Sequence, residues 1–191
     1  MNCLQFDSTA KKSVTRIFKP ACAILFTAAM LQNSALANVD VDVDMHAVSK
    51  SGQGELLGTV TLTENEHGVV FTPALKGLTP GQHGFHVHQY ASCEPKQKNG
   101  KVVPAGAAGG HFDPNSAKHH DEPWSNGHLG DLPALFVNER GEAKSPVLAP
   151  RLKLEQLKQH AVMIHKGGDN YADEPKKLGG GGKRVACGVI K

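Results

Sequence analysis

The chain has 191 residues, of which 39% are hydrophobic and 20% charged, as expected for one globular domain with its own core. Its net charge of +3 comes from the first 37 residues, which carry four of the 21 basic residues and one of the 18 acidic ones. The rest of the chain holds 17 of each and is therefore neutral, so the charge gives no support to a nucleic-acid-binding or membrane-surface protein.

Residues 1–37 have the features of a secretory signal peptide. Basic residues precede an apolar run over residues 21–31, and mostly small residues follow at 34–37. That run is about half of the roughly 20 residues that a membrane-spanning helix needs. Cys22 could suggest a lipid anchor, but a lysine and a proline precede it where such a site has apolar and small residues. We therefore expect the signal to be removed, leaving an exported domain of residues 38–191.

Removal of the signal leaves Cys93 and Cys187 as the only cysteines. One disulfide can then form, and an exported chain enters an oxidising compartment in which a disulfide persists. The alternative is a pair of buried free thiols.

The apolar pattern predicts an all-β domain. Over residues 39–48, valines and a methionine alternate with aspartates and a histidine, as on a strand with one buried face. About two turns of helix are expected over residues 153–159. The other expected strands, separated by turn residues such as Gly52, Asn65 and Gly141, cover residues 54–62, 69–75, 84–90, 134–138, 161–165 and 185–190.

Two long segments, residues 91–110 and 111–132, do not alternate and are rich in Gly, Pro, His and charged residues. Loops of this length in a compact domain are usually functional. We therefore look for the chemistry of the protein there.

His86 and His88 flank Val87 on an expected strand. Residues two apart on a strand point to the same face, so both imidazoles can reach one metal ion. A single His-x-His pair is a weak signal, and its weight depends on what the loops add.

The second loop adds three histidines and a carboxylate, a donor set that suits tetrahedral zinc. Four protein ligands close a zinc site, and closed sites are structural, because catalytic zinc keeps one position open. We therefore expect zinc to organise this loop, with a solvated polar loop as the alternative. The four residues are His111, His120, His128 and Asp131.

Several motifs in order resemble the copper,zinc superoxide dismutases over nearly the whole of the exported part. The resemblance is closest to the periplasmic bacterial branch, because of the run over residues 165–170 and the four glycines at 179–182. The motifs are Gly-Phe-His-Val-His at 84–88, Gly-Gly-His-Phe-Asp-Pro at 109–114, His-Leu-Gly-Asp-Leu-Pro at 128–133, Met-Ile-His at 163–165 and Arg-Val-Ala-Cys-Gly-Val-Ile at 184–190.

This resemblance implies an all-β, Greek-key fold: an eight-stranded barrel or immunoglobulin-like sandwich with two long functional loops and one disulfide. It implies copper and zinc as cofactors, one of each per subunit, with His111 bridging them, and a periplasmic location. The implied ligands are His86, His88, His111 and His165 for copper, and His111, His120, His128 and Asp131 for zinc.

Further roles follow from the same resemblance. Cys93 and Cys187 match the disulfide of the family, and Arg184 matches its anion-guiding arginine. Asp169 matches a carboxylate that links a copper histidine to a zinc histidine and so orients both rings. The implied catalytic residues are Arg184 and the bridging His111.

One zinc position has two candidates, because His119 and His120 are adjacent. We prefer His120, which stands three residues before Pro123 as the zinc histidine of the family usually does, and expect His119 to be solvated. The other histidines match no ligand motif and are expected to be ordinary surface or capping residues. They are His46, His67, His83 and His160.

The implied function is disproportionation of superoxide to oxygen and hydrogen peroxide by copper redox cycling, which protects against superoxide outside the cytoplasm. The superoxide anion is then the partner, and no nucleic acid or membrane is expected after signal removal. Two other classes stay open: a copper or zinc buffering protein, which would not need Arg184, and a zinc hydrolase, which Asp131 as a fourth ligand disfavours.

Trp124 lies in the second loop, residues 111–132, which we call the zinc loop. It is either core filler or the anchor of a homodimer interface, and we favour the interface slightly.

Overall fold

All strand pairings in the domain are antiparallel. The computed structural model describes residues 40–191, so the expected signal peptide lies outside the described residues. The strands are β1 (Val41–Ser49), β2 (Gly52–Asn65), β3 (Gly68–Leu75), β4 (Gly81–His83), β5 (Phe85–His88), β6 (Lys96–Lys98), β7 (Lys101–Val103), β8 (Leu135–Val137), β9 (Val147–Ala149), β10 (Ala161–His165) and β11 (Arg184–Val189). Three short 3-10 helices accompany them, η1 (Gly106–Ala108), η2 (Leu154–Leu157) and η3 (Leu178–Gly180).

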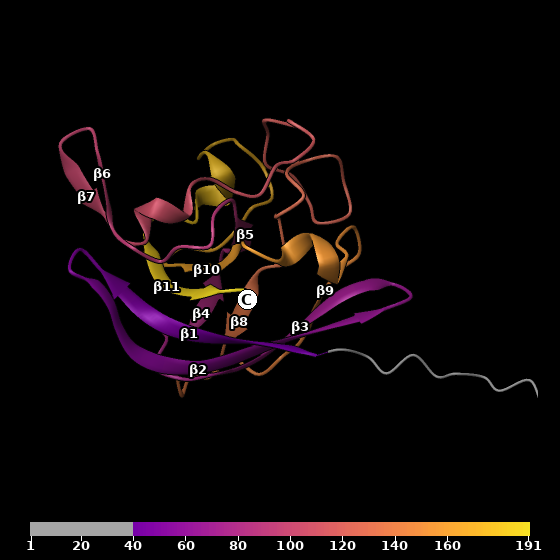
Figure 1. The fold of residues 1–191 in the computed structure, drawn as a ribbon, viewed down its shortest axis with the longest axis horizontal. Coiled ribbons are helices and arrows are strands. Elements are labelled where there is room, and N and C mark those ends of the chain that lie inside the picture. Colours follow the sequence, from indigo (N-terminus) through magenta and orange to yellow (C-terminus); the bar gives the residue numbers. More distant parts are fainter. Residues whose placement is uncertain (1–39) are drawn as a thin grey trace, which may run out of the picture. The chain divides into compact units, whose positions relative to one another are not determined.

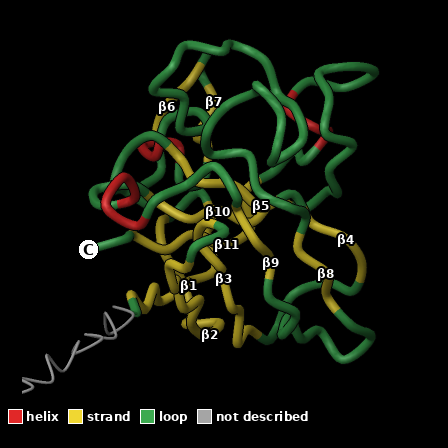
Figure 2. Tube along the Cα trace, turned by 90° about the vertical axis from the view of Figure 1, so that its right-hand side faces the viewer, coloured by secondary structure: helices red, strands yellow, loops and turns green. Residues whose placement is uncertain are grey.

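Seven strands form one curled sheet in the order β5-β10-β11-β1-β2-β3-β9, while β4 pairs with β8 and β6 pairs with β7. The long loops gather on one side of the domain, beyond β5 and β10, and β1, β2 and β3 lie on the other side (Figure 1). Figure 2 shows the same division and the separate β4–β8 pair. Only Gly84 separates β4 from β5 in the sequence. The β4–β8 pair therefore adjoins β5, the edge strand of the large sheet.

The alternation predicted for the first strand is present in β1. Val43 and Met45 are fully buried, whereas the alternate residues Asp42 and Asp44 are exposed. On that outer face, the Thr61 hydroxyl donates to the Asp42 carboxylate at 2.7 Å across the β1–β2 pair. Such cross-strand pairs support a strand on its solvated side. Asp44 and Asp40 accept in the same way, from Thr59 and Thr63.

The sheet curls where β1 and β2 lose their regular register beside Met45 and His46. Gly58 lies at this irregularity with a φ of +132°. A Cβ at that position would stand 2.1 Å from the Ala74 carbonyl oxygen, so only glycine allows β2 and β3 to approach this closely.

The core lies inside the curl and is built from alternate residues of the strands. Phe71 and Phe85 meet edge to face, with ring centroids 5.8 Å apart, and both are fully buried. Phe85 and Val87 therefore face this core, which leaves His86 and His88 of the same strand for the opposite side. The strand that carries the histidine pair is thus fixed by its apolar alternate residues.

The expected all-β class and the disulfide between Cys93 and Cys187 are confirmed. The strand count differs from the eight that were expected, because short pairs form in segments whose composition indicated loops. The β6–β7 hairpin, for example, lies within the loop 91–110. The helix expected over 153–159 is the four-residue 3-10 helix η2. Within the described residues, no helix is long and apolar enough to span a membrane.

Candidate metal centre

Strand pairing brings three histidines together. β5 and β10 are antiparallel neighbours, with Met163 opposite His86 and Ala161 opposite His88. His165 ends β10, and its backbone N–H donates to the Gly84 carbonyl at 2.8 Å. The three imidazoles consequently lie on one side of the β5–β10 pair, and the Nε2 atoms of His88 and His165 are 3.4 Å apart.

Each of these rings has one nitrogen committed to an oxygen acceptor. His86 Nε2 donates to Asp169 Oδ2 at 2.7 Å, His88 Nδ1 donates to the Gly109 carbonyl at 3.1 Å, and His165 Nδ1 donates to the Gly182 carbonyl at 3.1 Å. These bonds fix the tautomers and leave the other nitrogen of each ring for a metal ion.

His111 lies between this group and a second one. Its Nδ1 is 2.8 Å from Asp131 Oδ1, and its ring stacks on that of His86 with centroids 3.9 Å apart. A β-bridge between His88 and His111 holds the start of the second loop against β5. One imidazole thus faces both groups through its two nitrogens.

The second group forms around Asp131. His120 Nδ1 is 2.9 Å from Asp131 Oδ1, and His128 Nδ1 is 3.3 Å from Asp131 Oδ2. Both rings belong to buried residues. His119 is exposed and bonds to the Ala117 carbonyl instead, so the geometry favours His120 as the donor.

The donor atoms converge as metal sites require. His86, His88, His111 and His165 offer ligand atoms within 4.8 Å of one another. His86, His111, His120 and Asp131 do the same, and His128 reaches this second group through Asp131. Four buried ring nitrogens make no hydrogen bond of acceptable geometry, although the last two lie 2.9 and 3.3 Å from Asp131 oxygens: His86 Nδ1, His111 Nε2, His120 Nδ1 and His128 Nδ1.

Buried polar atoms without partners are costly, and in three of these rings, those of His86, His111 and His120, the other nitrogen is already bonded to a carboxylate. Two of them, on His86 and His111, face the first group, and two, on His120 and His128, face the second. A metal ion in each group would satisfy them. The donor sets fit copper in the all-imidazole group and zinc in the group with the carboxylate.

Burial keeps the first group neutral. Desolvation and the neighbouring His111 hold the pKa values of His86 and His88 well below their ordinary range. Burial likewise lowers the pKa of His165 to about 4. Neutral imidazoles with a free lone pair are the form that binds a metal ion.

The second group instead attracts positive charge. Burial alone would raise the pKa of Asp131, but the imidazoles of His111, His120 and His128 hold it far below its usual range. Burial acts to lower the pKa of His120, yet the carboxylates of Asp131 and Asp169 outweigh it and raise the pKa to about 9. A cation beside Asp131 is therefore favoured, and a divalent metal ion supplies one.

Asp169 joins the two groups. Its Oδ2 accepts from His86 Nε2 and its Oδ1 accepts from His120 Nε2, both at 2.7 Å. Gly179 makes room for this bridge, because a Cβ there would stand 1.9 Å from Asp169 Oδ1 and 2.8 Å from His120 Nε2. One member of the four-glycine run is thus required by the metal centre.

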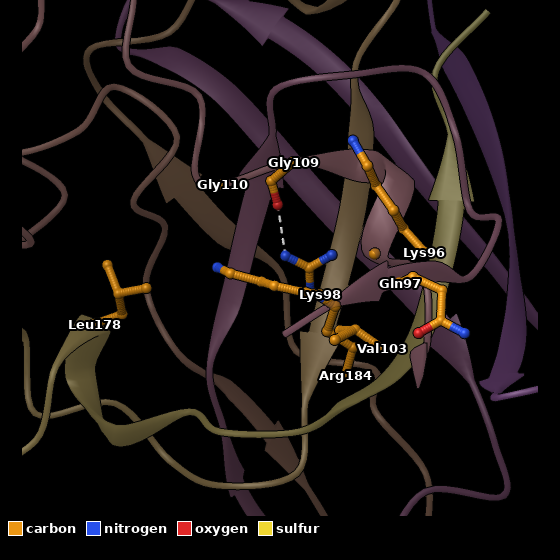
Figure 3. Close-up of a pocket in the computed structure, with 9 residues that line it drawn as sticks. Lys96, Gln97, Lys98, Val103, Gly109, Gly110, Leu178 and Arg184 are labelled. Carbon is orange, nitrogen blue, oxygen red and sulfur yellow. Dashed lines mark hydrogen bonds between the residues drawn. The ribbon is translucent and has the colours of Figure 1, made fainter. Parts of the chain in front are cut away.

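Arg184 lies beside the first group, in the strand next to β10. It is opposite His165 in the β10–β11 register, and its guanidinium donates to the carbonyls of Ala105 and Gly109. A pocket of about 450 Å³ opens there and is lined by Arg184, Lys96 and Lys98 among others (Figure 3). The residues that line this pocket include none of the metal-centre histidines.

Sequence reasoning missed Arg151. Its guanidinium donates to three carbonyls of the zinc loop, those of Pro123, Gly127 and His128, at 2.8, 3.1 and 2.6 Å. It therefore orders the loop that contains His128. Nothing local marks this role, because Arg151 follows β9 and contacts a segment more than 20 residues away.

The expectation for His83 as an ordinary surface or capping histidine was wrong. It is buried, with 2% exposure, because its ring lies between two backbone segments. Its position directly before the Gly-Phe-His-Val-His motif is the one sequence feature that could have drawn attention to it.

These features define a class: an all-β protein with two adjacent metal-binding groups, an imidazole that faces both of them, and an arginine in the strand beside the first group. The sequence profile described as copper/zinc superoxide dismutase matches residues 56–190. A superoxide dismutase (Cu-Zn) from Photobacterium leiognathi is 56% identical over 174 residues, which are 90% of this chain and 98% of that one. The corresponding protein of Escherichia coli K12 is 54% identical over 150 residues, covering 78% and 87%.

Solved structures similar to this chain point to the same family. The Cu/Zn superoxide dismutase from Brucella abortus has a TM-score of 0.79 and 49% identity, covering 80% of this chain and 100% of that one. The monomeric copper, zinc superoxide dismutase from Salmonella enterica has a TM-score of 0.73 and 54% identity, covering 80% and 100%. The chain belongs to the copper/zinc superoxide dismutase family, which makes it an oxidoreductase with copper and zinc as its metals. The resemblance found in the sequence motifs is confirmed.

Proposed function

We propose that this chain disproportionates superoxide with copper held by His86, His88, His111 and His165, and zinc held by His111, His120, His128 and Asp131. The observation that carries this assignment is the set of four buried, unpartnered imidazole nitrogens, divided between the two donor groups. Bound copper would supply one-electron redox chemistry, and bound zinc would supply fixed positive charge that orders its loop.

The protein itself holds the rings and handles protons. Two superoxide anions and two protons give one oxygen molecule and one hydrogen peroxide. His111 Nε2 is buried and would bind copper in this assignment. Whenever it is not bound to copper, it can hold a proton for the peroxide, because Nδ1 of the same ring is kept at Asp131. Asp169 orients His86 and His120 at once, so the two groups cannot shift independently.

Arg184 binds the anion and orients it. Its donor fork is held by two backbone carbonyls and stays aimed by that support, while the positive charge attracts superoxide. Lys96 and Lys98 line the same pocket and extend this local positive field, an arrangement for which superoxide dismutases are a familiar example. Local attraction matters because the exported domain has no net charge.

The test is superoxide decay followed directly by absorbance, with protein that holds both metals compared with the zinc-only form. We expect fast decay that requires copper, and a loss of about tenfold or more in Arg184→Ala, since electrostatic guidance raises association rates by at least that much. Equal decay in Arg184→Ala and the unsubstituted protein would contradict the role of Arg184. No acceleration with both metals bound would favour a metal-buffering protein, and hydrolysis with zinc alone would favour a hydrolase.

We further propose that residues 1–37 direct the chain to the periplasm and are removed after Ala37. The basic and apolar pattern of the segment and the disulfide of the mature domain support this location. Full-length protein expressed in a Gram-negative host should be recovered from the periplasm with Asn38 as its first residue by N-terminal sequencing. Leu25→Arg, which interrupts the apolar run, should keep the protein in the cytoplasm. Intact Met1 on periplasmic protein would overturn the cleavage.

A homodimer through the face around Trp124 is also proposed. The Trp124 side chain is 65% exposed and lies 6.5 Å from Tyr171 between ring centroids, and large exposed aromatics often mark interfaces. Sedimentation should show concentration-dependent dimers of the mature protein, and monomers for Trp124→Glu. A monomer at every concentration of the unsubstituted protein would remove the proposal and match the monomeric Salmonella relative.

A further inference from the structure

Two histidines outside the metal groups occupy equivalent positions in the β5–β10 pair. His83 precedes β5 with one glycine between them, and His160 directly precedes β10. β5 ends at His88 and β10 ends at His165. Because the two strands are antiparallel, a residue one or two positions before each strand lies near the histidine that ends the other.

Both histidines use this position in the same way. His83 Nδ1 donates to the main-chain carbonyl of His165 at 2.5 Å. His160 Nδ1 donates to the carbonyls at the end of β5, 3.2 Å from that of His88 and 2.8 Å from that of Gln89. Each strand of the pair is thus preceded by a histidine whose ring binds the backbone of the other strand's terminal histidine.

The far side of each ring also has a partner. When Nδ1 of His83 donates, Nε2 is an acceptor, and the Thr79 hydroxyl can donate to it at 3.3 Å. The His160 ring packs on Phe112, with centroids 4.0 Å apart, and Phe112 follows His111 and bonds to Val87 through its backbone N–H. The His83 ring therefore connects the end of β10 to Thr79, just before β4. The His160 ring connects the end of β5 to Phe112, at the start of the second loop.

We propose that His83 and His160 are positioning residues that fix the main chain of the copper ligands His165 and His88. β5 has four residues and β10 has five, so both ligands stand where the strand ladder ends and strands fray most easily. Holding both carbonyls keeps the two ligand rings at the separation that one metal ion needs. The inference rests on the proposed assignment of His88 and His165 to copper. It concerns how firmly the site holds copper and how the copper ligands are arranged.

The test uses the mature protein loaded with copper and zinc. His160→Ala removes the donor from a half-buried site, and His160→Asn keeps an N–H donor where Nδ1 stands. His46→Ala is the matched control, because His46 Nδ1 makes the same kind of bond, to the Gly54 carbonyl at 3.2 Å, away from the metal groups. The readouts are the rate of copper release to a chelator, the copper hyperfine splitting in the EPR spectrum, and the unfolding midpoint.

We expect copper release about tenfold faster in His160→Ala, the lower end of the effect of losing a group that orients a metal ligand. We expect a changed hyperfine splitting in that variant, recovery of both values in His160→Asn, and neither change in His46→Ala. His83→Asn combined with His160→Ala extends the test to the other strand and should release copper no more slowly than His160→Ala alone.

Three results would overturn the proposal. The first is an unchanged release rate and spectrum in His160→Ala, and the second is equally fast release in His46→Ala, which would indicate a general loss of stability. The third is failure of the unsubstituted protein to bind copper, which would also remove the ligand assignment under the proposed function. Copper binding by the unsubstituted protein is measured first, so the two failures are distinguishable.

Discussion

Asp169→Asn should weaken binding of both metals by about 10- to 100-fold, the cost that loss of a group orienting metal-bound histidines commonly has. The carboxylate accepts from His86 Nε2 and His120 Nε2 at 2.7 Å each, and from the Tyr171 backbone N–H at 2.8 Å. An asparagine has one acceptor oxygen, and its NH2 group would face an N–H of one of the rings. One imidazole must then change tautomer or turn, and it loses the nitrogen that faces the metal.

The measurement is competition with chelators for zinc and for copper, combined with metal content after dialysis. Asp173→Asn is the matched control, because Asp173 lies in the same loop and accepts from the backbone N–H groups of His120 and Leu178 rather than from a ring. It should change metal affinity far less. Equal affinity of Asp169→Asn and the unsubstituted protein for both metals would show that the bridge is dispensable.

Removal of the disulfide should lower the free energy of unfolding by about 4–5 kcal/mol, the chain-entropy value for a closed loop of this size. Cys93 and Cys187 are 94 residues apart in the sequence, and both are buried. Activity should fall as well, because the segment that Cys93 anchors includes Ala105 and Gly109, whose carbonyls hold the Arg184 guanidinium.

The variant is Cys93→Ala with Cys187→Ala, which leaves no free thiols among residues 40–191. Urea unfolding of the metal-loaded protein gives the stability, and superoxide decay under conditions where the variant is folded gives the activity. Adding Arg184→Ala to the pair should cost little further activity if the disulfide acts through Arg184. An unchanged unfolding midpoint would show that metal binding alone constrains the loop.

Several features of the site could be predicted from the sequence because they depend on residue type and local spacing. His86 and His88 are two apart on a strand whose other residues are apolar, so their face follows from the pleat. Cys93 and Cys187 are the only cysteines after residue 37, so their pairing has no competitor. The sequence motifs also placed the chain in its family, which the comparisons bear out.

Other features depended on which distant segments the fold brings together. Arg151 contacts carbonyls of the zinc loop, and backbone carbonyls are present at every residue, so no sequence pattern marks such a contact. His83 and His160 likewise bind carbonyls across the β5–β10 pair. The short strands of the loop segments, such as β6 and β7, also escaped prediction because three residues hold too little alternation to detect.

The sequence by itself therefore determined the all-β class, the donor types and the cysteine pair, because periodicity, residue chemistry and cysteine count are local or countable properties. The tertiary structure decided which nitrogen of each imidazole is committed and which is free, since that depends on acceptors such as Gly109, Gly182 and Asp169. It also decided that His120 rather than His119 lies beside Asp131. Two adjacent histidines have the same chemistry, and only the path of the folded loop distinguishes them.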